Sequence, residues 1–341
     1  MEQLLRDVGI GEDKTTQELF ISYDVAEKIK NRLSEGRYNA DLDLIAAAPW
    51  IAEQLRQLLP NSVVDVLEAF GSQNRLTCLT IRGLPTEKQL PATPYLDYLT
   101  PDNIPLVSAL NIGIYQLANI MPVAYQNENK GRLLRHVVPT KHGRNEKSSQ
   151  GSLRKFGLHV DNPDLALTPE CVDDISACPE FLSLMAIRSD VRVRSSIVQL
   201  DDVLENLSLG TIEQLCEPNF ELARPDSFNH AKKTRLPLIV FNREGIAFTR
   251  YDKENATPLT PKAAAALLMY EAQLALPSNH INTLFLPGDF LLFRNQRVMH
   301  ARSGFEPRDD GADRWLVRLF GMSSLCRIKS INDQQRHISL D

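Results

Sequence analysis

The chain has 341 residues, of which 43% are hydrophobic and 24% are charged, and its formal net charge at pH 7 is −5. This length and apolar content are sufficient for one large domain with a sizeable core. Acidic and basic residues are interspersed, so the composition disfavours a nucleic-acid-binding surface and favours a small-molecule partner.

The N-terminal segment MEQLLRDVGIGEDKT is charged throughout and lacks the apolar stretch of a secretory signal. No apolar run reaches the length of a transmembrane helix. We therefore expect a cytoplasmic protein without a membrane partner, while the oligomeric state stays open. The five cysteines form no Cys-x-x-Cys pair and are expected to be reduced, buried apolar residues rather than the chemistry of the site: Cys78, Cys171, Cys178, Cys216 and Cys326.

The first part of the chain is predicted to be mainly helical. Residues 41–60 carry apolar side chains at helical spacing, and residues 100–122 begin with the N-cap signals Thr100 and Asp102. Both segments end at a proline. Between them, residues 75–85 have the composition of a strand.

From about residue 131 the sequence changes to short β-rich runs, such as LPLIVFN and NTLFLPGDFLLF, which are separated by turn residues. One helix, at about 260–276, is inserted among them. No repeat or linker divides the chain. We therefore expect a single domain, 1–341, in which residues 1–130 pack on a β-core formed by residues 131–325.

The run FGLHVDNPD, residues 156–164, places His159 and Asp161 two positions apart. In an extended strand both side chains leave on one face, about 6.6 Å apart, so they can bind a single ion. The pair alone does not distinguish a metal site from a structural histidine. A ferrous site needs a second histidine, and His300 is the best candidate. The polar segment 140–152 is a candidate loop or lid over this strand.

The later run DRWLVRLFGM is predicted to be a strand whose alternation places Arg314 and Arg318 on one face. Its apolar residues suggest that both faces are covered, and a buried guanidinium needs an anion to offset its desolvation. The cavity would then take two carboxylates. In the alternative, the two arginines pair at the surface with nearby acids: Asp309, Asp310 or Asp313.

These runs resemble the iron(II)- and 2-oxoglutarate-dependent oxygenases, and more narrowly their clavaminate synthase-like branch, which hydroxylates free amino acids such as arginine, lysine and asparagine. The resemblance rests on HVD and on the downstream run GDFLLFRNQRVMHARSGFEPRDDGADRWLVRLFG. It covers roughly residues 90–325. It implies an α+β fold whose core is a double-stranded β-helix (jelly-roll, cupin-like) with flanking helices.

The resemblance also implies which residues bind which groups. Iron(II) would be held by His159, Asp161 and His300, and 2-oxoglutarate and O2 would take the remaining positions. Arg314, fourteen residues after His300, matches the family arginine that binds the distal carboxylate of 2-oxoglutarate. Arg318 matches the family arginine that binds the substrate carboxylate.

Four further contacts are implied by shorter matches. In IRSDVRVRSS, Ser195 would help to hold 2-oxoglutarate, and Ser149 and Gln126 would contact the substrate. Asp252 would face a cationic substrate side chain, unless it is only a solvated loop acid. Two features depart from the family pattern: Asp161 stands where many members of the branch have glutamate, and the segment before LMAIRSD is longer than usual.

The implied activity is hydroxylation of an unactivated C–H bond of a free L-amino acid, with release of succinate and CO2. The acid at Asp252 favours a basic substrate, lysine first and then arginine. The carboxylate at Asp161 favours hydroxylation over halogenation. Alternatives are a carrier-tethered amino acid, another small acid such as a sulfonate, a β-helix binding module without turnover, and a zinc hydrolase. The hydrolase would lack a general base and leave Arg314 unexplained.

Overall fold

The computed structural model of the chain describes the following residues: 15–73, 75–96, 98–140, 143, 152–172, 176–228 and 230–341. The predicted contact Ser149 and most of the predicted lid, 140–152, lie outside the described residues.

The larger sheet has eight strands in the order β1-β2-β14-β6-β16-β3-β17, with β4 paired to β16. Its strands are β1 (Thr16–Phe20), β2 (Cys78–Arg82), β3 (Met121–Tyr125), β4 (Arg135–Val137), β6 (Phe181–Arg188), β14 (Phe290–Arg294), β16 (Trp315–Met322) and β17 (Ile338–Ser339). Three of them, β1, β2 and β3, precede residue 130. The N-terminal part therefore contributes strands to the core as well as the helices that were expected to pack on it.

The smaller sheet has four antiparallel strands in the order β13-β7-β15-β5. They are β5 (Phe156–His159), β7 (Ser195–Gln199), β13 (His280–Thr283) and β15 (Val298–Arg302). β15 pairs with β5 so that His300 lies opposite His159. This sheet thus brings together two histidines that are far apart in the sequence.

The two sheets share a buried apolar layer. Leu184 and Leu291 of the larger sheet belong to one cluster with Ile197 and Val298 of the smaller one. Strand β16 follows the predicted alternation, because Leu316 and Phe320 join this cluster while Trp315, Val317 and Leu319 join the cluster beneath the helices. Every residue of β16 is buried. Both faces of the strand are therefore covered, as its sequence predicts.

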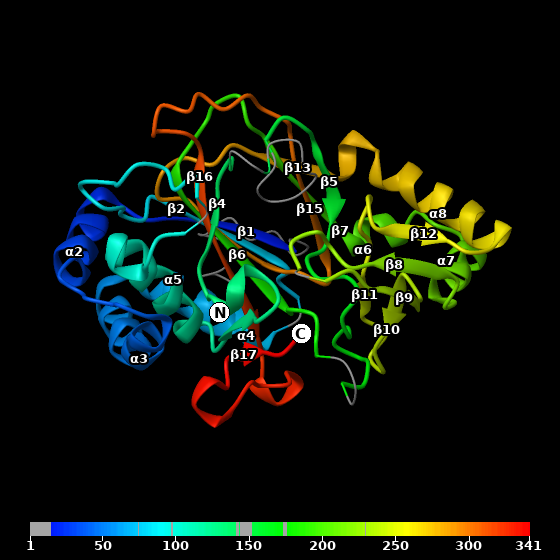
Figure 1. Ribbon diagram of the computed structural model, residues 1–341, viewed down its shortest axis with the longest axis horizontal. Coiled ribbons are helices and arrows are strands. Elements are labelled where there is room, and N and C mark those ends of the chain that lie inside the picture. The colour runs from blue at the N-terminus through cyan, green and yellow to red at the C-terminus, as the bar shows by residue number, and fades with distance from the viewer. Residues whose placement is uncertain are drawn as a thin grey trace.

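Helices flank this two-sheet core on both sides, with α2, α3 and α5 at one side and α7 and α8 at the other (Figure 1). The helices are α2 (Tyr23–Leu33), α3 (Asp41–Leu58), α4 (Asn61–Ser72), α5 (Pro105–Leu117), α6 (Leu200–Leu204), α7 (Leu209–Cys216) and α8 (Pro261–Leu274). α3 and α8 match the predicted segments. α5 begins at Pro105 rather than near residue 100, because a proline suits the first turn of a helix.

Short elements complete the fold. The 3-10 helices are η1 (Pro101–Asn103), η2 (Asn129–Gly131), η3 (Pro277–Asn279), η4 (Leu325–Arg327) and η5 (Asp333–Gln335). Two small sheets are formed by β8 (Phe220–Ala223), β9 (Lys233–Leu236) and β12 (Ala256–Pro258), and by β10 (Ile239–Phe241) and β11 (Ala247–Thr249). Side chains from α6, α7 and α8 pack with Val198 and Met299 on the outer face of the smaller sheet.

All five cysteines are unpaired, as expected, but only Cys78 and Cys178 are buried, and Cys171 and Cys326 are exposed. The expectation of buried cysteines is therefore wrong for the two exposed ones. Among the described residues, none of the helices combines the length and the apolar character that crossing a bilayer requires.

Gly288, just before β14, packs closely against Leu84, just after β2, and Gly245 offers a comparison in open space. Gly288 and Gly245 have φ of 88° and 79°. A Cβ on Gly288 would lie 2.1 Å from the carbonyl oxygen of Leu84, whereas one on Gly245 would meet nothing within 4 Å. Leu84 also donates its backbone N–H to the Gly288 carbonyl at 3.0 Å.

We expect G245A to lower the free energy of unfolding by about 1–2 kcal/mol, the cost of the left-handed conformation. G288A should cost about 1–3 kcal/mol more, because the Leu84 backbone must move to admit the methyl group. Urea denaturation of both variants measures the difference. Equal losses would mean that the close approach at Gly288 does not constrain the fold.

Candidate active site

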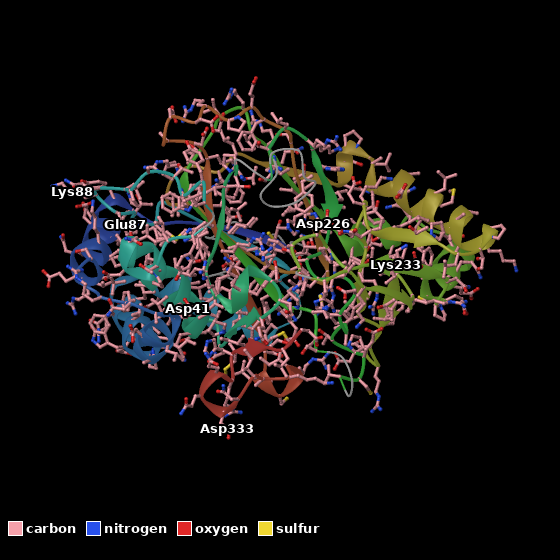
Figure 2. The ribbon with its side chains drawn as sticks, in the orientation of Figure 1. Asp41, Glu87, Lys88, Asp226, Lys233 and Asp333 are labelled. Atoms are coloured by element: carbon pink, nitrogen blue, oxygen red, sulfur yellow. The ribbon has the colours of Figure 1, made fainter. Side chains whose placement is uncertain are left out.

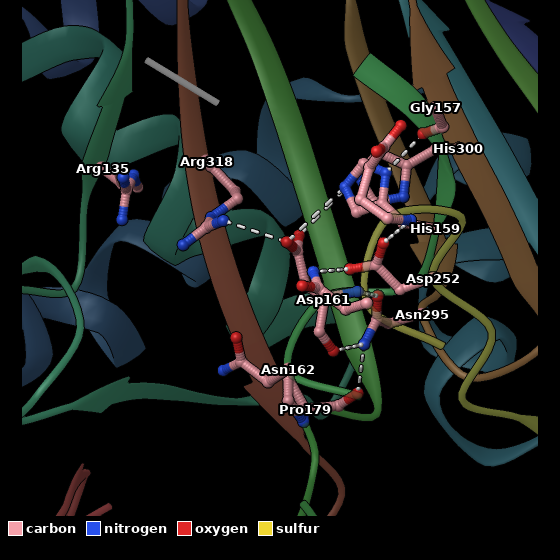
Figure 3. Close-up of polar contacts among 12 residues, drawn as sticks. Arg135, Gly157, His159, Asp161, Asn162, Pro179, Asp252, Asn295, His300 and Arg318 are labelled. Atoms are coloured by element: carbon pink, nitrogen blue, oxygen red, sulfur yellow. Dashed lines mark hydrogen bonds and ion pairs between the residues drawn. The ribbon is translucent and has the colours of Figure 1, made fainter. Parts of the chain in front are cut away.

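The three predicted metal ligands lie together at the β5 edge of the smaller sheet (Figure 3). Their ligand atoms all lie within 4.8 Å of one another. His159 on β5 and His300 on β15 have ring centroids 4.1 Å apart. Asp161 follows β5, with its Oδ1 3.8 Å from Nε2 of His159 and its Oδ2 3.7 Å from Nε2 of His300. The cluster offers the two imidazoles and one carboxylate of a non-haem ferrous site.

The surroundings of the two imidazole rings suit metal binding. Nδ1 of His159 lies 2.8 Å from the carbonyl oxygen of Gly157, to which it donates, so Nε2 is the ring nitrogen directed at Asp161. Burial, followed by the charges of His159 and Arg318, holds the pKa of His300 well below its ordinary value. Within the described chain, Nε2 of His159 and Oδ2 of Asp161 are buried without a hydrogen-bond partner. A divalent metal ion bound by this nitrogen and this oxygen would supply the missing partner.

Arg318 lies between the cluster and a buried glutamate. Its Nη1 donates to Oδ1 of Asp161 at 3.3 Å, and its Nη2 donates to Oε1 of Glu128. Glu128 also accepts hydrogen bonds from Arg135 at 3.1 Å and from Asn162 at 3.3 Å. The arginine is therefore held in orientation by two carboxylates, which offset the cost of burying its charge.

One cavity extends from the cluster along the space between the sheets. Its polar lining includes His300, Ser195, Arg302, Arg314 and Arg318. Nη2 of Arg314 donates to Oγ of Ser195 at 3.4 Å. Burial lowers the pKa of Arg314 to about 9 and that of Arg302 to about 10, and the charge of Arg302 adds to the effect on Arg314. Both groups still carry positive charge at neutral pH, so this cavity is suited to an anion.

Arg314 and Arg318 are buried rather than exposed at the surface, and Asp313, next to Arg314, is bound by other groups. The carboxylate of Asp313 accepts from the phenol of Tyr95 and from the backbone N–H groups of Arg308 and Asp309. Arg314 lies within the cavity instead. The alternative in which Arg314 and Arg318 form surface ion pairs is therefore wrong.

A second cavity adjoins the first at the cluster, because both are lined by His159, Asp161 and Arg318. His159, Asp161 and Arg318 line its inner end, and a rim of loop residues lines the rest: Pro225, Asp226, Ser227, Asp252, Glu254 and Asn255. Asp226 and Glu254 are exposed at this rim. The second cavity thus carries acids where the first carries arginines, so it is suited to a cation.

Asp252 is part of the cavity wall and also stabilises its own turn. It forms a β-bridge with His159, and its side chain is almost fully buried. Oδ1 accepts the backbone N–H of Glu254 at 2.9 Å, and Oδ2 accepts from the amide of Asn255 at 2.7 Å. Burial raises the pKa of the Asp252 carboxyl. It is therefore not the solvated loop acid of the alternative interpretation.

Among the remaining predicted contacts, Ser195 lies in the first cavity beside Arg314, but Gln126 does not reach the site. Gln126 is exposed, lines neither cavity, and uses its backbone N–H to pair with Ser339 at 2.8 Å. Two positions later, Glu128 is buried and contacts Arg318. The sequence match was to a glutamine, so it passed over the acid that contacts Arg318.

Sequence reasoning also missed Arg302, Asp226 and Asn295. Arg302 could have been found, because it follows His300 by two positions on a strand and so leaves on the same face. Asp226 lies in the loop between β8 and β9. Asn295 lies in the turn between β14 and β15 and contacts the backbone of Asp161. Nothing in the local sequence marks either of these two as part of the site.

Known proteins share both the sequence pattern and the fold. Residues 181–320 match the family described as Taurine catabolism dioxygenase TauD, TfdA family. The chain is 27% identical over 303 residues to L-lysine 3-hydroxylase of Catenulispora acidiphila, covering 86% of this chain and 80% of the relative. It is 26% identical over 281 residues to clavaminate synthase 2 of Streptomyces clavuligerus, covering 79% of this chain and 81% of that one.

Among solved structures, an asparagine oxygenase in complex with Fe(II), 2S,3S-3-hydroxyasparagine and succinate superimposes with a TM-score of 0.79. The alignment has 23% sequence identity and covers 95% of this chain and 99% of the other. This likeness confirms the predicted jelly-roll fold. Together with the ligand cluster and the family match, it confirms the resemblance noted in the sequence. The chain is therefore an iron(II)- and 2-oxoglutarate-dependent oxygenase similar to the clavaminate synthase-like enzymes, and its residues 181–320 match the TauD/TfdA family.

Proposed function

We propose that this oxygenase hydroxylates a free L-amino acid with a basic side chain, lysine in preference to arginine. The observation that carries the proposal is the division of charge around the cluster. One cavity ends in buried arginines, the other is rimmed by acids, and both reach His159 and Asp161. A dicarboxylate and a cationic amino acid would each find a complementary cavity beside the same metal ion.

His159, Asp161 and His300 are the residues that would hold the iron. When bound, iron(II) and 2-oxoglutarate supply the oxidation, in which 2-oxoglutarate, O2 and a substrate C–H bond give succinate, CO2 and an alcohol. The chain contributes three ligands and leaves the other coordination positions open to small molecules. It also encloses the reacting atoms between two sheets, which limits the access of water.

The first cavity would hold 2-oxoglutarate. Arg314 and Ser195 would bind the carboxylate far from the metal, and Arg302 adds a second positive charge to the same cavity. The described hydrogen bond of Arg314 is to a neutral hydroxyl, so a carboxylate would supply the anion that its burial requires. The planar guanidinium also matches a carboxylate in geometry, which favours a fixed orientation of the cosubstrate.

The second cavity would hold the amino acid. Arg318 lines both cavities and would receive the α-carboxylate close to the cluster. The side chain would then extend towards Asp226, Asp252 and Glu254 at the rim. A terminal ammonium or guanidinium group would meet oxygen acceptors there, whereas an anionic side chain would be repelled. The name of the relative from Catenulispora acidiphila, L-lysine 3-hydroxylase, supports a basic substrate.

Two other substrate classes are alternatives to a free basic amino acid. A small sulfonate is suggested by the family description, which names taurine catabolism. A carrier-tethered amino acid would need the second cavity to admit a phosphopantetheine arm. We expect neither to be the main substrate, because the acidic rim selects a free cationic group.

The first test is turnover with a panel of the twenty amino acids and taurine, with iron(II), 2-oxoglutarate and air. We expect a product heavier by one oxygen with lysine or arginine, together with stoichiometric succinate. Turnover of taurine alone would contradict the basic-substrate proposal. Binding of 2-oxoglutarate without turnover of any free compound would indicate a tethered substrate instead.

The metal ligands can be tested separately with Co(II), whose visible absorption reports binding. We expect H300A to weaken Co(II) binding by at least about tenfold, since it removes one of three protein ligands. H280A is the matched control, because His280 lies in the same sheet and its Nε2 contacts the carbonyl of Leu274 at 2.7 Å. Equal Co(II) affinity in both variants would contradict the assignment of His300.

The acidic rim predicts a selective effect of D226N. We expect kcat/KM for lysine to fall about tenfold, the loss of one charge-assisted hydrogen bond, with little effect on 2-oxoglutarate binding. Asp226 is a cleaner target than Asp252, whose oxygens stabilise a turn. D333N is the control, because Asp333 lies far from Asp226 in the molecule (Figure 2). A D226N enzyme with unchanged kcat/KM for lysine would remove Asp226 from the substrate site.

A further inference from the structure

The backbone of Asp161 is held by a side chain rather than by a strand. Strand β5 ends at His159, and the next backbone N–H, that of Val160, donates to the carbonyl of Tyr251 at 2.9 Å. The N–H of Asp161 instead donates to Oδ1 of Asn295 at 2.9 Å. In return, Nδ2 of Asn295 donates to the carbonyl of Asp161 at 3.0 Å (Figure 3). One amide therefore satisfies both backbone groups of a predicted metal ligand.

The Asn295 amide can adopt only one useful orientation. Its side chain is fully buried, and Nδ2 also donates to the carbonyl of Pro179 at 3.0 Å. A flipped amide would point its NH2 group at the N–H of Asp161 and its oxygen at two carbonyls. The backbone of Asn295 is fixed too, because its own N–H donates to the carbonyl of Glu180 at 2.9 Å.

The position of this amide links two ligands of the cluster. Asn295 occupies the turn that joins β14 to β15, and His300 lies on β15 five residues later. The backbone turns sharply after Asp161, where Asn162 has a φ of 57°. An aspartate side chain has only two rotatable bonds, so the position of its backbone largely determines where its oxygens lie.

We propose that Asn295 is a positioning residue that sets the Asp161 carboxylate relative to His300 for metal binding. The inference rests on the proposed function, in that the cluster must bind iron(II). Loss of the amide would leave the N–H of Asp161 without its partner and its carbonyl with only the Cys178 thiol, whose Sγ donates at 3.3 Å, and would let the carboxylate shift. Contacts that orient metal ligands in this way typically change metal affinity or activity by about 10- to 100-fold when removed.

The adjacent residue offers a matched control. Gln296 is also a buried amide of the same turn. Its Oε1 accepts from the N–H and the hydroxyl of Thr168 at 2.7 and 2.8 Å, and its Nε2 donates to the carbonyl of Cys178 at 2.9 Å. It makes no described hydrogen bond to Asp161. Removing either amide should destabilise the turn, but only the loss of Asn295 should affect the ligand.

The test is Co(II) titration of N295A and Q296A, followed by visible absorption, with thermal unfolding as a measure of stability. We expect N295A to weaken Co(II) binding by at least about tenfold, and Q296A to change it by less than about threefold. Both variants should lose comparable thermal stability. Equal weakening in the two variants would show a general effect on folding and overturn the proposal.

A second pair keeps the test valid if an alanine variant does not fold. N295Q retains a buried amide but moves it by one methylene, and Q296N makes the reverse change next to it. We expect N295Q to alter the Co(II) spectrum and to release succinate in excess of hydroxylated product, whereas Q296N does neither. If N295Q showed the wild-type Co(II) spectrum and the wild-type ratio of succinate to hydroxylated product, the positioning role would be overturned. Failure of the wild-type protein to bind Co(II) would instead overturn the proposed function.

Discussion

The pairing of β15 with β5 is the interaction on which the site depends. It places His300 opposite His159, and the chain continues from β5 directly to Asp161. The same strand β15 pairs on its other edge with β7, which sets Arg302 opposite Ser195. The position of β15 between its two neighbours therefore fixes both the His159–His300 pair and one wall of the arginine-lined cavity. A slip of one residue would turn His300 and Arg302 away from the cavity.

Strand β16 of the larger sheet carries a buried charge among apolar side chains. Leu316 and Phe320 of β16 pack between the sheets, while Arg318 of the same face is held by Asp161 and Glu128. An unpaired charge in this setting would cost several kcal/mol. Each arginine on the cavity side thus needs either a built-in carboxylate or an anionic ligand. Arg318 is paired with two carboxylates of the chain, whereas the described hydrogen bond of Arg314 is to the neutral hydroxyl of Ser195.

The sequence predicted the parts of the site that follow from local periodicity. The alternation along β16 holds in the structure, with Leu316 and Phe320 on one face and Trp315, Val317 and Leu319 on the other, because a strand of period two leaves little freedom. His159 and Asp161 also meet, although Asp161 follows the end of β5 and its backbone is held by Asn295. Parts that depend on contacts between distant segments were not predictable. Glu128 reaches Arg318 across the larger sheet, and no local pattern indicates this pairing. The role of β1 and β2 in that sheet was missed for the same reason.

The two cavities differ in how strongly charge can act within them. Arg314 and Arg302 are buried, so their attraction for a carboxylate is weakened little by water or salt. Asp226 and Glu254 are exposed, and charges in contact with solvent are screened over about 8–10 Å at ordinary salt concentrations. On the proposed function, a cosubstrate carboxylate would be held firmly and a cationic side chain would be selected more loosely. On the same proposal, discrimination between lysine and arginine would come mainly from the length and shape of the second cavity, because both amino acids carry the same charge.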